Sequence, residues 1–369
     1  MALQCGIVGL PNVGKSTIFN ALTAAGAEMA NYPFCTIEPN VGVVAVRDPR
    51  VDALVTLVKP QRVVPTVMEF VDIAGLVKGA SQGEGLGNQF LGHIRQVDAV
   101  AHVVRCFVDD DITHVQGRVD PVTDIQVIET ELMLADLAAV EKRLTATSKK
   151  AKVGEKEAKL LEQLYQRVVQ GLNDGTPIRL QGLTAEELAS LKDLFLLTSK
   201  PVMYVCNVAE DELLQAQQEG GHAMVDAVRR LAVEQNAAVV AICGRIEAEM
   251  GELDEAERQV FLEDLGVSES GLDRLVRKAY DLLGLMTFFT VGVKEVRAWT
   301  VKQGATAYDA AGAIHTDFQR GFIRAEVIAF DEMIACKGEQ GAKEKGKFRL
   351  EGRDYLVADG DCMHFRFNV

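Results

Sequence analysis

A glycine-rich segment near the N-terminus has the residue types and the spacing of a phosphate-binding loop. Residues 9–16 read Gly-Leu-Pro-Asn-Val-Gly-Lys-Ser and fit the pattern G-x-x-x-x-G-K-[ST]. The apolar run Gln4–Val8 precedes this segment and the helical pattern Lys15–Ala25 follows it, which predicts a strand, a loop and a helix. In such a loop, glycines let backbone N–H groups converge on phosphate oxygens at the positive end of the helix. The sequence therefore predicts a nucleotide phosphate site.

Three side chains could supply the charge and the metal ligands that phosphate chemistry needs. Lys15 would neutralise the β- and γ-phosphates, and the Ser16 hydroxyl would ligate Mg²⁺. Asp72 closes the predicted strand Thr66–Val71, where a carboxylate can hold Mg²⁺ directly or through water. We expect Lys15 to act in catalysis, and Ser16 and Asp72 to belong to a magnesium site.

Two further residues have the positions of nucleotide switches. Gly75 ends the motif Asp72-Ile-Ala-Gly75, and its N–H could sense the γ-phosphate. Thr36 lies between the first predicted helix and the second predicted strand, where a threonine would close on Mg²⁺; an ordinary loop hydroxyl is the alternative. Several glycines follow and indicate a segment that reorganises with the nucleotide state, namely Gly79, Gly83, Gly85, Gly87 and Gly92.

The segment Asn207-Val-Ala-Glu210 stands where P-loop GTPases commonly carry N-K-x-D and read guanine. The usual aspartate accepts two hydrogens from guanine. Glu210 is longer by a methylene, and Val208 keeps the packing but not the ammonium. Losing such a matched polar pair costs orders of magnitude in discrimination. Asn207 could pair with the amine and N7 of adenine. We therefore expect ATP to be preferred, with a shifted loop that still reads guanine as the alternative.

The residue after Gly75 is Leu76, where many GTPases place a glutamine that orients the attacking water. Leucine cannot hydrogen-bond to water, so slow turnover is expected unless another group replaces the glutamine. His114, in a polar loop, is the first candidate and His93 the second; an ordinary surface or structural histidine is the alternative for each. Asn12 could also help to bind a monovalent cation such as K⁺.

Short apolar runs separated by helical patterns must position these residues. Such alternation predicts an α/β domain with a mostly parallel sheet. The expected strands are Gln4–Val8, Val41–Val46, Thr66–Val71, Ala99–Arg105, Val202–Cys206 and Ala238–Ile242.

A long interruption, residues 124–200, separates the fourth and fifth of these strands. Two runs of leucine, isoleucine and valine at helical spacing predict an antiparallel helical hairpin. Its tip, Ser148–Lys156, is polar and basic, which suits either a solvated loop or a contact with nucleic acid. Thr184 and Glu187 have the spacing of a capping box that opens a further helix.

The pattern changes after Gly284 to short strands around one helix, Ala307–Phe318. We expect a compact α+β module. Its predicted strands are Thr287–Val291, Arg297–Val301, Arg324–Ala329, Tyr355–Val357 and Cys362–Asn368.

Composition favours a globular protein of two or three domains. The chain has 369 residues, 48% hydrophobic and 25% charged, and no apolar run approaches the ~20 residues of a membrane span. The net charge of −14 lies entirely before Leu285, because the tail carries 12 basic and 12 acidic residues. No basic N-terminal region marks a signal peptide. Seven cysteines without metal or redox spacing fit reduced thiols in a cytoplasm.

Together these motifs resemble the YchF family of Obg-like ATPases. The resemblance covers the whole chain and rests on the phosphate loop, Asp72-Ile-Ala-Gly-Leu-Val-Lys-Gly-Ala80 and Asn207-Val-Ala-Glu210. Two further segments carry it, residues 31–40 (Asn-Tyr-Pro-Phe-Cys-Thr-Ile-Glu-Pro-Asn) and the closing His364-Phe-Arg-Phe-Asn-Val369.

The resemblance implies a nucleotide-binding G domain, residues 1–280, that is interrupted by a coiled-coil insertion at 124–200. A ubiquitin-like (β-grasp) TGS domain would occupy 281–369. It also implies ATP hydrolysis and metal contacts at Ser16 and Thr36. The base would contact Asn207 and Val208, and Glu210 of the same motif would belong to the nucleotide site. The phosphates would contact Asn12, Val13, Gly14, Lys15, Ser16 and Thr17.

Two hypotheses of function remain open at this point. The chain is either an ATPase switch that reports its nucleotide state to the ribosome, or a nucleotide-modulated adaptor for the ribosome or RNA in which hydrolysis is incidental. Family members are associated with translation and with oxidative stress. RNA would bind through the TGS domain and the coiled-coil tip, and the chain would be a monomer that binds no membrane. Cys35, beside Thr36, is either an inert thiol or a redox sensor.

Overall fold

The computed structural model describes residues 3–26, 40–73 and 86–368. It divides into two compact units, each formed by chain segments that are distant in sequence. The first unit comprises Met1–Val44 and Glu69–Leu275, and the second comprises Ala45–Met68 and Val276–Val369. In the described residues, no helix is long and apolar enough to cross a membrane.

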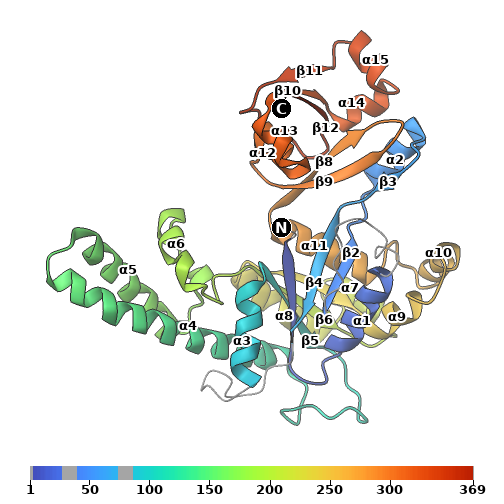
Figure 1. The fold of residues 1–369 in the computed structure, drawn as a ribbon. Helices are drawn as coiled ribbons and strands as arrows, with labels where there is room; N and C mark the ends of the chain where they lie inside the picture. The colour runs from blue at the N-terminus through green and yellow to red at the C-terminus, as the bar shows by residue number, and fades with distance from the viewer. Residues whose placement is uncertain (1–2, 27–39, 74–85, 369) are drawn as a thin grey trace. The chain divides into compact units, whose positions relative to one another are not determined.

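The first unit is built on a sheet whose strand order is β2-β4-β1-β5-β6-β7 (Figure 1). The pairs β1–β4, β1–β5, β5–β6 and β6–β7 are all parallel, which confirms the predicted parallel sheet. The carboxyl ends of β1, β5, β6 and β7 therefore meet at one edge. The strands are β1 (Gln4–Val8), β2 (Val41–Ala45), β4 (Val67–Asp72), β5 (Ala99–Arg105), β6 (Val202–Asn207) and β7 (Ala238–Ile242).

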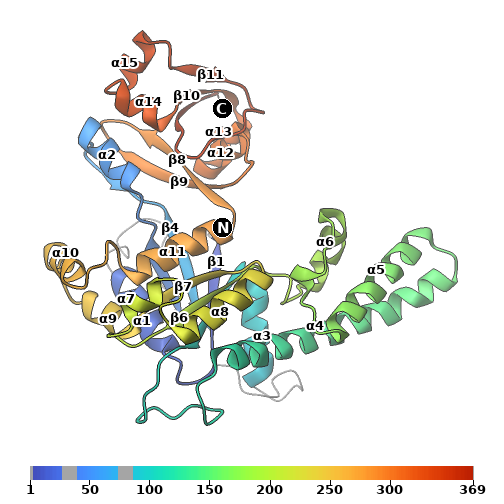
Figure 2. The ribbon, with the colours of Figure 1, turned by 180° about the vertical axis from the view of Figure 1, so that it is seen from behind.

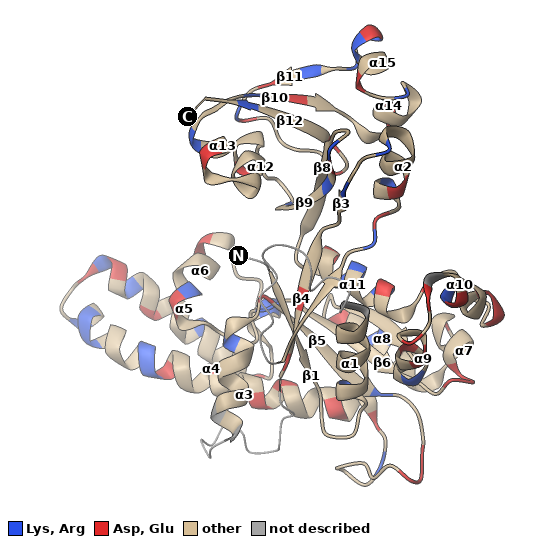
Figure 3. Cartoon of the chain, turned by 45° about the vertical axis from the view of Figure 1, so that its right-hand side comes forward, with Lys and Arg blue, Asp and Glu red and all other residues tan. Residues whose placement is uncertain are grey.

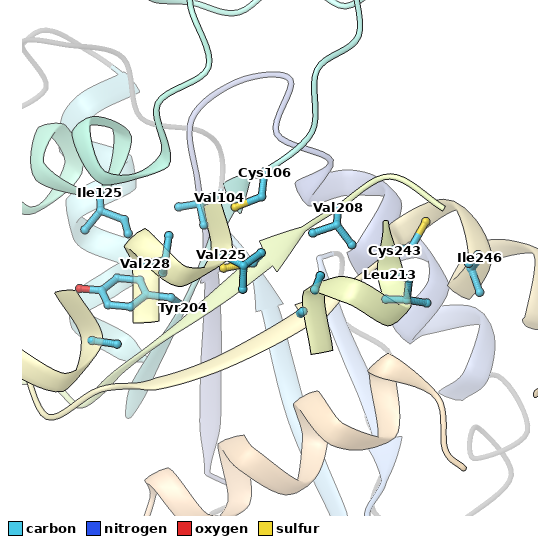
Figure 4. Packing of buried hydrophobic residues seen from close by; sticks show 14 of the residues in the cluster. Val104, Cys106, Ile125, Tyr204, Val208, Leu213, Val225, Val228, Cys243 and Ile246 are labelled. Carbon is cyan, nitrogen blue, oxygen red and sulfur yellow. The ribbon is translucent and has the colours of Figure 1, made fainter. Parts of the chain in front are cut away.

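The central strands are nearly continuous apolar runs because helices cover both faces of a parallel sheet. Every residue of β5 is buried. Figure 4 shows one face, where Val104 and Tyr204 pack with Val225 and Val228 of α8. The helices of this unit are α1 (Lys15–Gly26), α3 (Leu86–Gln96), α4 (Pro121–Lys152), α5 (Lys156–Asn173), α6 (Ala185–Leu191), α7 (Leu213–Gln217), α8 (Ala223–Glu234), α9 (Gly244–Met250), α10 (Glu255–Asp264) and α11 (Gly271–Leu282), which continues into the second unit.

Helices α4 and α5 form the predicted antiparallel hairpin and project from the sheet, as both views show (Figures 1 and 2). Asp136 anchors its base, because its buried carboxylate accepts hydrogen bonds from the backbone of Leu197 and Thr198 at 2.8 Å each. Basic residues gather toward the tip (Figure 3). Lys149, Lys150, Lys152 and Lys156 there are exposed. The capping box of Thr184 and Glu187 is confirmed at the start of α6.

The second unit has its own six-stranded sheet, in the order β11-β10-β12-β8-β9-β3. Two predictions here are wrong. Tyr355–Val357 is not a strand but makes a single bridge through Leu356, and the helix expected over Ala307–Phe318 is broken at His315 into two. The elements are α2 (Pro49–Val58), β3 (Val63–Val64), β8 (Leu285–Val291), β9 (Val296–Lys302), α12 (Ala307–Ile314), α13 (Thr316–Arg320), β10 (Phe322–Ile328), α14 (Phe330–Ala335), α15 (Glu339–Glu344), β11 (Arg349–Glu351) and β12 (Cys362–Phe367).

Helix α2 and strand β3 were not predicted, and both belong to the second unit. Strand β3 pairs in parallel with β9 through Val63 and Val64. Leu54 of α2 is fully buried against Phe289 and Ala298 of the C-terminal sheet. The second unit therefore depends on a segment that precedes most of the first unit in the sequence.

Leu54→Ala should lower the free energy of unfolding of the second unit by about 2–5 kcal/mol, because it leaves a cavity in this core. Trp299, the single tryptophan, lies in the second unit and gives a fluorescence signal for its unfolding in urea. The exposed Thr56→Ala in the same helix is the matched control. Equal unfolding midpoints for the two variants would contradict a structural role for α2 in this unit.

Candidate nucleotide site

The loop between β1 and α1 has the backbone that a phosphate-binding loop requires. Asn12 and Gly14 adopt positive φ angles of 66° and 90°. A Cβ at Gly14 would lie 2.1 Å from Nδ2 of Asn207, so no larger residue fits there. A Cβ at Gly9 would lie 2.8 Å from the carbonyl oxygen of Val103. At both glycines of the motif, an atom from a neighbouring strand lies where a Cβ would otherwise be.

This loop lines a pocket of about 590 Å³ in which the predicted phosphate residues meet. Lys15 forms an ion pair with Asp72 inside the pocket. Lys15 follows β1 and Asp72 ends β4, so the parallel pairing of these two strands brings the two side chains to the same edge of the sheet. The lining residues are Leu10, Pro11, Asn12, Gly14, Lys15, Ser16, Thr17 and Asp72. Val13 is buried beside them.

The donor set in the phosphate pocket fits Mg²⁺. The Ser16 hydroxyl and the Asp72 carboxylate are hard oxygen ligands that line one pocket, and Mg²⁺ takes few protein oxygens together with water and phosphate oxygens. No group of three or more His, Cys, Asp or Glu side chains that could hold a metal occurs among the described residues. Thr36, Gly75, Leu76 and Cys35 lie outside the described residues, so their predicted roles stay predictions.

A second pocket of about 910 Å³ opens beside the first, and both share Asn12, Gly14 and Thr17. It has the size of a ligand site and is lined by three loops that follow parallel strands. The loop after β5 contributes Phe107, Val108, Asp109 and Ile112. The end of β6 and the loop after it contribute Asn207, Val208, Ala209, Glu210 and Asp211. Cys243 after β7, Gly244 and Arg245 at the start of α9, and Leu265 complete the lining. Its place next to the phosphate pocket makes it the candidate base site.

Asn207 uses its side-chain amide to join the phosphate loop to the start of α9. Its Nδ2 donates to the carbonyl oxygen of Val13 at 3.0 Å, and its Oδ1 accepts from the backbone N–H of Gly244 at 3.0 Å. The side chain is 6% exposed. A side-chain amide has a second N–H and a second oxygen lone pair, so the expected pairing of Asn207 with adenine stays a prediction. Asn207 thus fixes the phosphate loop to the start of α9.

Val208 and Glu210 both line the candidate base pocket. Val208 is 2% exposed and packs in the apolar cluster of Figure 4, so it presents no charge beside the base. Its backbone N–H donates to the carbonyl oxygen of Ile242 at 2.9 Å. A valine held in this way cannot supply the ammonium that a lysine would place along a guanine.

His114 is buried and has a partner at each ring nitrogen. Its Nε2 lies 2.9 Å from Oδ2 of Asp124, and its Nδ1 accepts from the backbone N–H of Gln116 at 3.2 Å. Nε2 therefore carries the proton and donates it to Asp124. The structure supports a structural role for His114, and a direct action on water would require it to leave Asp124. His93, the second candidate, is exposed on α3.

Arg105 and Asp124 are buried charged residues that hold the loop after β5, and neither is predicted from the sequence. Arg105 ends the buried strand β5 and is 1% exposed, and Asp124 lies in the first turn of α4 and is 1% exposed. Burial raises the pKa of Asp124, whereas the hydrogen bond from His114 lowers it. The sequence does contain a sign of Arg105, because a charged residue within an apolar run indicates a buried charge with partners. No such sign marks Asp124, because acidic residues are common in the first turns of helices.

The parallel sheet, the phosphate loop and the adjoining base pocket define a P-loop nucleotide-binding domain of the GTPase type. A family model described as 50S ribosome-binding GTPase matches residues 4–130. The model of the YchF-type GTPase C-terminal domain, described as a protein of unknown function, matches residues 285–368.

Relatives match along the whole chain. The chain is 58% identical to the ribosome-binding ATPase YchF of Haemophilus influenzae and 56% identical to that of Bacillus subtilis, with 100% of both chains covered in each comparison. A solved structure of the Schizosaccharomyces pombe YchF GTPase superposes with a TM-score of 0.88 at 36% identity, covering 99% of this chain and 97% of that chain. The chain belongs to the YchF family.

Asn207→Ala should weaken nucleotide binding by about tenfold or more, because it frees the phosphate loop from the start of α9 and leaves two buried backbone groups without partners. Isothermal titration with ATP measures the effect. The exposed Asn173→Ala on α5 is the matched control. Unchanged affinity in Asn207→Ala would show that the phosphate loop does not need this bridge.

His114→Ala should lower the free energy of unfolding by about 2–3 kcal/mol, because it leaves the Asp124 carboxyl buried without its donor. Asp124→Asn retains an acceptor for Nε2–H and should cost less. Urea unfolding of the two variants and of the double variant gives the coupling energy. A coupling near zero would remove the pair as a structural element, and a selective loss of turnover would restore the catalytic interpretation of His114.

Proposed function

We propose that this chain is a ribosome-binding ATPase that prefers ATP to GTP. The observation that carries the base preference is the wall of the base pocket, where Val208 is buried and apolar and Glu210 replaces the shorter aspartate of a guanine-reading motif. Neither residue offers guanine the matched ammonium and carboxylate that discriminate it from adenine. The relatives that are named ribosome-binding ATPase support the same activity and partner.

In this proposal the chain's own residues hold the triphosphate and its charge. The backbone of residues 12–17 wraps the phosphates, and Lys15 neutralises the charge that develops on the oxygens in the transition state. Ser16 and Asp72, with Thr36, would hold Mg²⁺, which supplies further neutralisation when bound. Gly75 would sense the γ-phosphate, and Asn12 would contribute to a K⁺ site.

Slow intrinsic turnover is part of the proposal, because Leu76 offers no hydrogen bond to a water. His114 remains our proposed replacement only if the loop that carries it rearranges, since Asp124 and Gln116 hold both of its nitrogens in this structure. A partner that rearranges this loop would then accelerate hydrolysis. The protein would act as a monomeric cytoplasmic switch in translation, with a link to stress.

The helical hairpin and the C-terminal unit are the proposed contacts with ribosomal RNA. The hairpin tip carries exposed lysines, which suit a phosphate backbone (Figure 3). In the C-terminal unit, Arg297 stacks on Trp299 with 3.8 Å between the guanidinium carbon and the ring centroid.

We also propose two functional domains, residues 1–280 with the insertion 124–200, and residues 281–369. A nucleotide-modulated adaptor is the second candidate function, because Leu76 leaves hydrolysis without an evident water-positioning group.

The proposal predicts that isothermal titration gives a lower dissociation constant for Mg·ATP than for Mg·GTP, and that ribosomes raise the rate of ATP hydrolysis. Lys15→Ala should abolish nucleotide binding and any ribosome-dependent function, whereas the exposed Lys192→Ala should leave both intact. Tighter binding of GTP would refute the base preference. Full function of Lys15→Ala would favour the adaptor.

A further inference from the structure

A wholly buried arginine closes strand β5 beside the base pocket. Arg105 is 1% exposed, and its guanidinium donates three hydrogen bonds, all to backbone carbonyls of the loop that follows. Nε donates to Phe107 at 3.1 Å, Nη1 to Ile112 at 2.9 Å and Nη2 to Asp109 at 3.0 Å. The guanidinium carbon also lies 4.6 Å from the ring centroid of Phe107. One side chain thus holds three points of a six-residue turn.

The residues that Arg105 holds are those that form one wall of the base pocket. Phe107, Asp109 and Ile112 all line the pocket of about 910 Å³, and each gives its carbonyl oxygen to the guanidinium. The positions of their side chains in the pocket wall are therefore fixed through their backbones. Moving the guanidinium would move the wall.

The charge and shape of arginine suit this position better than any other side chain. Three carbonyl oxygens that converge on one buried point need donors in a fixed plane, and only the guanidinium offers five N–H groups in such a fork. A buried cation in turn costs free energy unless its donors are satisfied. The loop conformation and the burial of Arg105 therefore depend on each other.

The far end of the same loop is attached to the phosphate site. Nδ2 of Asn12 donates to the carbonyl oxygen of Thr113 at 3.1 Å, and His114 follows with its hydrogen bond to Asp124. Asn12 belongs to the phosphate loop and lines both pockets. The loop thus connects the wall of the base pocket to the phosphate loop, and the Arg105 guanidinium holds its first half.

We propose that Arg105 is a positioning residue that holds residues 107–113 as a preformed wall of the base pocket before nucleotide binds. Binding then costs little ordering of this loop, and the base meets a wall of fixed shape. The inference rests on the proposed nucleotide function, but it concerns which residue shapes the pocket and not which base is preferred.

Arg105→Lys tests the proposal, because it keeps the charge and removes the planar fork. The dissociation constant for ATP should rise about tenfold. Inorganic tripolyphosphate needs only the phosphate loop, so its own dissociation constant should stay within about twofold of the wild-type value. Displacement of a fluorescent ATP analogue measures it, once the weaker binding of the analogue to the variant is taken into account. Arg118→Lys, exposed in the same loop, is the matched control. Equal losses for both ligands, or no loss for ATP, would overturn the proposal.

Hydrogen exchange of the wild-type protein tests whether the wall is preformed, even if the variant does not fold. The backbone N–H groups of Asp111 and Ile112 donate to Asp109 within the loop. In the nucleotide-free protein these amides should already exchange slowly with deuterium, and Arg105→Lys should speed their exchange selectively. Amides that become protected only after ATP is added would show that the nucleotide, not Arg105, orders the wall. A wild type that binds GTP more tightly would refute the proposed base preference and leave this inference standing.

Discussion

The site depends first on one buried amide. Asn207 ends β6 and bridges the phosphate loop at Val13 to the start of α9 at Gly244. Its presence dictates a glycine at position 14, where a Cβ would lie 2.1 Å from the amide nitrogen. The glycine spacing of the phosphate loop and the last residue of a strand almost 200 positions later therefore answer to one packing constraint.

Buried polar side chains organise the remaining loops at the same edge of the sheet. Arg105 and Asn207 lie opposite each other in the parallel register of β5 and β6, and each sends its polar group into loops that no backbone ladder can order. Because each group is buried, the loss of any one of these hydrogen bonds would lower the stability of the fold by about 1–3 kcal/mol. This edge is consequently held by a few specific side chains, while the sheet below it is held by interchangeable apolar ones.

The sequence was sufficient where a pattern is local. Gln4–Val8 and Ala99–Arg105 were predicted to the residue, because their runs of apolar residues report burial in a parallel sheet. It was insufficient where a contact is distant. Leu54 packs on a sheet more than 200 residues later, and nothing in its own helix indicates that partner. Likewise the sequence shows the type and position of Asn207 but does not indicate its partners, because an amide suits a base and a backbone equally well.

The ion pair of Lys15 with Asp72 affects how much free energy the site gains when phosphate binds. Phosphate must compete with Asp72 for Lys15, so the gain from the ammonium is the difference between two attractive partners and not a full charge interaction. A divalent cation beside the phosphates gives the Asp72 carboxylate a new partner, which removes the competition. In the proposed function, nucleotide alone would therefore gain less at this site than nucleotide with its cation. Asp72 also ends β4 and stands three positions before Gly75 in the sequence. Under the proposed function, this exchange of partners would connect the phosphates with the predicted switch segment.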